Sequence, residues 1–213
     1  MERAEEADCI VALASARSTL WISVEDLRKS YGDKIVFVPT LWLDGLASVE
    51  SFSDAGNNKI FGAEALIAEA RRTSFEEMSQ AFLRGRVRTD QQARFAASID
   101  RIRDLEQGNI PISDYLLDTY RDTPIANAVG HPSNIVVREL FLRVAKELGL
   151  DGSKVDFSNP TLMGRITLPR GMRAFTPYDV EEHGLNFSAE AGWLLDAKRI
   201  LLLVKSSFKA QLA

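Results

Sequence analysis

The chain has 213 residues, of which 46% are hydrophobic and 26% charged, close to the averages of folded globular proteins. This length predicts a single α/β domain over residues 1–213 and excludes a large multidomain array. With 26 basic and 30 acidic residues the formal charge is −4, so no overall positive field attracts nucleic acid or a membrane surface.

Cysteine and histidine are scarce. The single cysteine, Cys9, cannot form an internal disulfide, and two histidines leave little material for a metal site, so we expect no metal and a reducing compartment. The charged residues 2–6 stand where a secretory signal would have a basic start and an apolar run. The apolar run 200–204 is too short to cross a bilayer, so a cytoplasmic protein without a membrane span is predicted.

The first third predicts a strand–helix–strand unit. The apolar runs Cys9–Leu13 and Lys34–Val38 indicate buried strands, and Pro39 ends the second one. Between them, apolar residues recur at helical spacing at Leu20, Val24, Leu27 and Tyr31. Ser23 and Asp26 form a capping pattern for the start of this helix, and Gly32 ends it. This order is typical of a parallel βαβ unit.

The middle of the chain predicts several helices. Short ones are expected over 63–72 and 75–84, and a capping box at Thr89–Gln92 opens a longer one that ends at Gly108. A capped helix should follow from Ser113. The apolar face of the long helix is predicted at Phe95, Ile99, Ile102 and Leu105.

A short strand at 125–129 then leads into a helix over 133–148. The apolar stripe of that helix is predicted at Val137, Leu140, Phe141, Val144 and Leu148. Residues 154–172 show no period and are expected to form a loop, and a C-terminal helix is favoured after Ser188.

His131 is the strongest candidate for chemistry, because imidazole exchanges protons near neutral pH and this one precedes a predicted helix start at the end of a strand. The alternative is that residues 131–134 only begin the helix, with Ser or Asn capping its amides.

Ser15, Arg17 and Ser18 follow the first strand and would share a rim with His131 in a parallel sheet. His183, in a charged segment, is interpreted as a solvated or capping residue, and Cys9 as a small buried hydrophobe.

Standard phosphate-loop, dinucleotide and nucleophile-elbow motifs do not occur in the sequence. The chain nevertheless resembles the WcbI-like family of polysaccharide-biosynthesis acetyltransferases. The residues that carry this resemblance are 95–106, 112–115 and 130–134 in this order, with weaker landmarks at 36–39, 43–45, 176–178 and 184–185.

The resemblance implies a Rossmann-like, SGNH-related three-layer sandwich with a mainly parallel sheet and extra helices. It also implies binding of coenzyme A or acetyl-CoA and acetylation of a sugar in a capsular or exopolysaccharide precursor. His131 would be the general base with Asp114 nearby, and the cofactor-binding residues would be Ser15, Arg17, Ser133 and Asn134.

The family's Asn-Cys-Gln motif does not occur, since Cys9 stands between Asp8 and Ile10. We therefore expect the chain to begin downstream of that motif, and a sheet without its first strand to offer an edge for a homodimer. Two other functions stay open. One is a carbohydrate esterase with Ser15 as nucleophile, and the other is a catalytically inactive binding subunit in which His131 only caps a helix.

Overall fold

The structure is a computed structural model that describes residues 8–14, 24–54, 57–154, 157, 171–174, 176–187, 198 and 200–206. The first half contains β1 (Ile10–Ala14), α2 (Val24–Tyr31), β2 (Ile35–Pro39), β3 (Val49–Asp54), β4 (Asn57–Phe61), α3 (Ala63–Arg72) and α4 (Phe75–Leu83). The second half contains α5 (Gln91–Glu106), α6 (Ser113–Thr119), β5 (Ala126–Ala128), β6 (His131–Pro132), α7 (Asn134–Glu147), β7 (Gly171–Ala174) and α9 (Pro177–His183). Residues 200–206 are helical, as predicted.

The predicted α/β class is confirmed, but the described strands do not form one mainly parallel sheet. β1 and β2 make a parallel pair, β4, β3 and β7 an antiparallel sheet in that order, and β5 and β6 an antiparallel pair. β4 is the next strand along the chain after β3 and pairs with it in antiparallel register, from Glu50 opposite Phe61 to Asp54 opposite Asn57. Sequence periodicity identified β1, β2 and β5 and the parallel pairing of β1 with β2, but it did not identify β3, β4 or β7.

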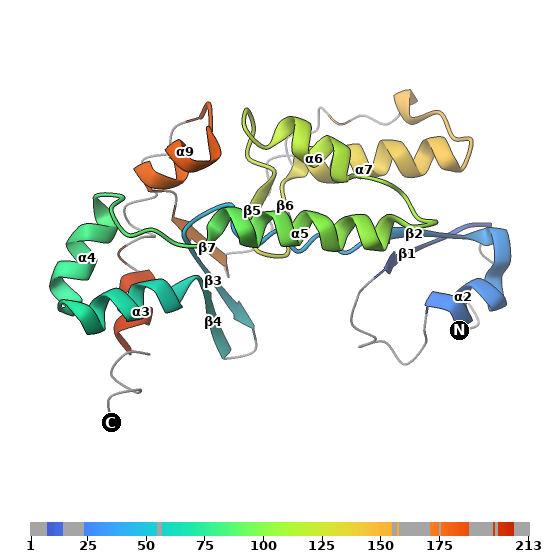
Figure 1. Cartoon of the computed structure of the whole chain (residues 1–213). Helices are drawn as coiled ribbons and strands as arrows, with labels where there is room; N and C mark the ends of the chain where they lie inside the picture. The colour runs from blue at the N-terminus through green and yellow to red at the C-terminus, as the bar shows by residue number, and fades with distance from the viewer. Residues whose placement is uncertain are drawn as a thin grey trace.

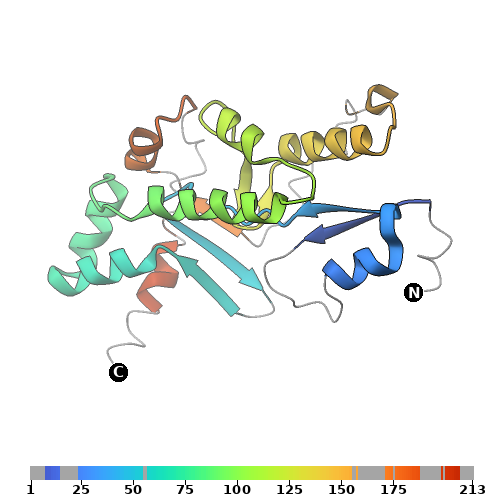
Figure 2. The ribbon, with the colours of Figure 1, turned by 45° about the vertical axis from the view of Figure 1, so that its right-hand side comes forward.

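The βαβ prediction is confirmed in the order of its elements and in the parallel pairing of its strands. Ile10 pairs with Ile35 and Ala14 with Pro39 in parallel register, and α2 is the connection between these strands. Its helical residues begin at Val24 and end where Gly32 adopts a φ of 54°. The predicted start at Ser23 lies outside the described residues. In Figures 1 and 2 this unit occupies one end of the molecule, α3 and α4 the other, and α5 lies between them.

The middle of the chain packs against one face of α5. Its predicted apolar face is confirmed, because Phe95, Ile99 and Ile102 are buried. They pack with residues of the segment after β2, of α6 and of the β5–α7 region, namely Leu41, Leu43, Leu46, Ile112, Leu116, Ile125, Ala126 and Val136. The site region around residues 125–136 thus rests directly on α5.

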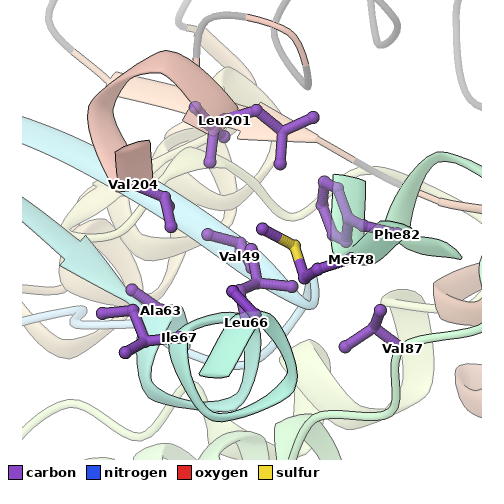
Figure 3. Packing of buried hydrophobic residues seen from close by; sticks show 11 residues of the cluster. Val49, Ala63, Leu66, Ile67, Met78, Phe82, Val87, Leu201 and Val204 are labelled. Atoms are coloured by element: carbon purple, nitrogen blue, oxygen red, sulfur yellow. The ribbon is translucent and has the colours of Figure 1, made fainter. Parts of the chain in front are cut away.

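A second cluster lies at the α3–α4 end. Figure 3 shows Leu66 and Ile67 of α3 and Met78 and Phe82 of α4 packed around Val49 at the start of β3. Leu201 and Val204 close the cluster from the C-terminal helix. A third and smaller cluster is built on Ala14, Ile35 and Phe37 in the βαβ unit.

Two predicted apolar faces are wrong in part. Val11 and Leu13 of β1 were expected to be buried but are 54% and 61% exposed, because only the other face of this two-stranded ladder carries a packed cluster. In α7, Val136 and Val144 face the core, whereas Val137 and Phe141 are 49% and 43% exposed. The predicted stripe is therefore correct at Val144 and at Leu140, which packs against the α5 cluster, and wrong at Val137 and Phe141.

The helix starts differ from the predicted capping patterns. Asp90 occupies the N-cap of α5 without a side-chain cap, so the predicted Thr89–Gln92 box does not form. The start of α6 is capped by a residue of another helix, Glu106 at the end of α5. Its carboxylate accepts hydrogen bonds from the backbone N–H groups of Ile112 and Ser113, each at 2.5 Å. Among the described residues, no helix is both long enough and apolar enough to cross a membrane.

Candidate functional site

The candidate site is the junction between β5 and α7. β5 and β6 are two short antiparallel strands joined by a turn, and Gly130 in that turn has a φ of 73°. A Cβ at this position would lie 3.1 Å from the Trp42 ring, so the close approach of the turn to the indole also favours glycine. Trp42 is a neighbour of the site that the sequence did not single out.

His131 has a defined tautomer. Its Nδ1 lies 3.1 Å from the carbonyl oxygen of Val129, and a carbonyl can only accept, so Nδ1 carries the proton. In the neutral ring the lone pair therefore resides on Nε2, the arrangement that a general base needs. The residue is half-buried.

Ser133 holds the N-cap position of α7, but its side chain makes no cap hydrogen bond. Its backbone N–H donates to the carbonyl oxygen of Ile125 at 2.9 Å, which fixes the residue in place. The residue is only 8% exposed, and its Oγ has no hydrogen-bond partner in the described structure. A buried hydroxyl without a partner beside a helix N-terminus suits a ligand oxygen, so these residues fit an oxygen-rich group such as part of coenzyme A.

Asp114 lies elsewhere. It is on α6 and forms an ion pair of 2.7 Å with Arg143, and the hydrogen bond from Arg143 lowers the pKa of its carboxyl group. Arg143 stands nine positions beyond Asn134 along α7, which corresponds to roughly 14 Å of helix. The pairing therefore holds Asp114 toward the far end of α7 from His131. Ser15, Arg17 and Ser18 lie outside the described residues.

A buried polar cluster that the sequence did not reveal lies beneath the start of α5. Asp179 is fully buried and accepts hydrogen bonds from the backbone N–H groups of Ser48 at 2.7 Å and of Thr176 at 2.6 Å, as well as from the Ser48 hydroxyl. Burial raises the pKa of its carboxyl group, outweighing the hydrogen bonds that lower it. The pattern Thr176-Pro177-Tyr178-Asp179 is a capping box with proline at the first turn, and this signal could have located α9.

His183 contradicts its predicted role as a solvated or capping residue. It is only 4% exposed at the end of α9, and its Nε2–H donates to the carbonyl oxygen of Gly45 at 2.8 Å. Its ring also meets the rings of Phe95 and Tyr120 edge-on. The charged residues around His183 in the sequence gave no sign that this face of α9 is buried together with Asp179.

His183 makes folding sensitive to acid. Burial lowers its pKa below the ordinary value of 6.5, so the unfolded chain binds a proton that the folded protein resists, and stability falls as the pH drops below 6.5. Between pH 7.5 and 5.5 we expect wild type to lose about 1 kcal/mol more unfolding free energy than His183→Gln. Urea denaturation at both pH values measures this difference, and an equal loss in the two proteins would contradict it.

The family model described as polysaccharide biosynthesis enzyme WcbI matches residues 60–153. The predicted resemblance to the WcbI family is confirmed. The match runs from the end of β4 through α7, and so includes Asp114, His131, Ser133 and Asn134.

A solved structure of a WcbI enzyme is also similar to this chain, with a TM-score of 0.50 and 16% identity. The alignment covers 95% of this chain and 80% of the other. At this identity the likeness supports the fold alone. That protein is described as a novel polysaccharide biosynthesis enzyme, in its native form without a disulfide bond between coenzyme A and one of its cysteines. No curated protein shows significant similarity to this chain.

Proposed function

We propose that the chain is a coenzyme A-dependent acetyltransferase that acts on a sugar hydroxyl in capsular or exopolysaccharide biosynthesis. The observation that carries this proposal is the hydrogen bond from His131 Nδ1–H to Val129, which orients the ring and places the lone pair of the neutral imidazole on Nε2, beside the start of α7. The family match and the coenzyme A named for the similar enzyme support the same chemistry.

The proposal gives a role to each of His131, Ser133 and Asn134. Ser133 Oγ would donate a hydrogen bond to the cofactor, and Asn134, the first residue of α7, would line the same place. Bound acetyl-CoA supplies a thioester carbonyl that an alcohol can attack. His131 would take the proton from the sugar hydroxyl as its oxygen attacks, and would return it to the departing coenzyme A sulfur as the C–S bond breaks. The amides at the start of α7 would stabilise negative charge on an oxygen nearby.

The other predicted residues have less structural support. Arg17 and Ser15 remain predicted cofactor contacts outside the described residues. A catalytic role for Asp114 also remains a prediction, since its ion pair with Arg143 holds it along α7. An SGNH-related ancestry, a cytoplasmic location and a homodimer through the outer edge of β1 likewise remain predictions.

His131→Gln tests the proposal. We expect wild type to bind acetyl-CoA in calorimetry and to release free coenzyme A thiol when sugar acceptors are added. The variant should bind acetyl-CoA but transfer 10²- to 10⁴-fold more slowly, because the proton acceptor is lost. Lys146→Gln, an exposed change at the opposite end of α7, is the matched control and should match wild type. No binding of acetyl-CoA by wild type, or full activity of His131→Gln, would overturn the proposal.

A further inference from the structure

A pocket lies apart from the His131 junction. It has a volume of about 350 Å³ and lies between one face of α5, the end of α6 and the end of α9. This volume is at the small end of the range for ligand sites and suits one compact ligand. Its lining includes Phe95, Asp100, Arg103, Tyr120, Arg121 and Glu182.

The charges around this pocket balance. Arg103 and Arg121 contribute two positive charges, and Asp100 and Glu182 two negative ones, with Arg103 and Asp100 paired at 3.3 Å. A balanced rim gives no net attraction for a phosphate or another anion. It does offer guanidinium donors and carboxylate acceptors side by side, which suits a ligand whose hydroxyl groups both donate and accept.

The wall of the pocket is aromatic. The rings of Phe95 and Tyr120 have centroids 5.0 Å apart, and His183 closes the same corner. The Arg121 guanidinium lies over the Tyr120 ring, 5.4 Å from its centroid, and its Nε–H donates to the Tyr120 hydroxyl at 3.1 Å. The pocket therefore combines an apolar ring surface with polar groups that are already held in place.

Three segments far apart in the sequence are fixed together here before any ligand binds. The Gln92 side-chain amide donates to the carbonyl oxygen of Glu182 at 2.7 Å, which ties α5 to the end of α9. His183 ties the same helix end to Gly45 through its Nε2–H at 2.8 Å. Such fixed walls reduce the ordering that a ligand would otherwise have to impose.

We propose that this pocket binds a neutral sugar unit. One face of a sugar ring is rich in C–H groups and would lie against the aromatic wall. Its hydroxyl groups would bond to Arg103, Arg121 and the neighbouring carboxylates. The site does not depend on the chemistry of His131, so the two proposals can fail separately.

The test measures binding of glucose, galactose, mannose and N-acetylglucosamine to the full chain by ligand-observed NMR, with inorganic phosphate and acetyl-CoA as comparison probes. We expect at least one neutral sugar to bind and Arg103→Gln or Arg121→Gln to weaken it about tenfold or more. Arg101→Gln, an exposed arginine on α5 outside the pocket lining, is the matched control and should bind as wild type does.

Three results would overturn the proposal: no neutral sugar binds at millimolar concentration, the pocket variants bind as tightly as Arg101→Gln, or the substitutions weaken phosphate binding only. Circular dichroism of each variant shows that it is folded, so a loss of binding reports on the pocket. Binding of acetyl-CoA to the same samples reports separately on the acetyltransferase proposal.

Discussion

Gly45→Ala should destabilise the protein by about 3–5 kcal/mol, because two separate costs add at this position. Gly45 has a φ of 88°, a conformation that an L-residue adopts only with strain. An added Cβ would also lie 2.5 Å from the backbone nitrogen of Phe95 and closer still to the backbone oxygen of Gln91. Both contacts are main-chain atoms of α5, which cannot move aside as a flexible side chain would.

Gly149→Ala separates the two costs. Gly149 has a φ of 67°, but a Cβ there would meet no atom within 4 Å, so only the conformational cost of about 1–2 kcal/mol applies. Urea denaturation of wild type and both variants gives the three unfolding free energies. Equal losses of unfolding free energy in the two variants would show that the close contact between Gly45 and α5 adds no cost.

Asp179→Ala should cost a similar amount, about 3–5 kcal/mol, through lost hydrogen bonds. The substitution leaves the backbone N–H groups of Ser48 and Thr176 buried without their acceptor, and the Ser48 hydroxyl loses one as well. It also breaks the capping box that begins α9. The end of α9 carries His183, so the loss should extend to the pocket against α5.

The pH dependence of the unfolding free energy tests whether the Asp179 carboxyl group causes this loss of stability. Its pKa is raised from 3.8 in the folded protein, so its favourable contribution is complete below pH 3.8 and declines as the pH rises through the folded pKa. The difference in unfolding free energy between wild type and Asp179→Ala should therefore be largest at acid pH. Glu181→Ala, an exposed change in the same helix, should stay within about 0.5 kcal/mol of wild type. A difference that grows toward neutral pH would contradict this assignment.

Local patterns were sufficient to predict most helices. The spacing of Phe95, Ile99 and Ile102 identified the buried face of α5, and Gly108 marked its end with a φ of 69°. These features depend on residues close together in the chain. The pairing of β3 with β7 was not predictable in this way, because it joins Val49 to Ala174 across most of the sequence.

The candidate site was predicted only in part. The strand-to-helix position of His131 followed from local sequence, but its bond to Val129 and the lack of a partner for Ser133 Oγ depend on how the turn folds back. His183 shows the opposite case. Its charged neighbours suggested solvent exposure, whereas its burial depends on Gly45, which is remote in the sequence.

The three hydrophobic clusters differ in size, and a region with a smaller cluster requires less free energy for local opening. The βαβ unit rests on Ala14, Ile35 and Phe37 with partly buried neighbours, and none of the described α2 residues is fully buried. Its local opening therefore requires less free energy than opening of the body around α5. The cluster that supports residues 125–136 contains residues of α5 and none of β1, so an opening confined to β1 and α2 leaves the packing at His131 in place.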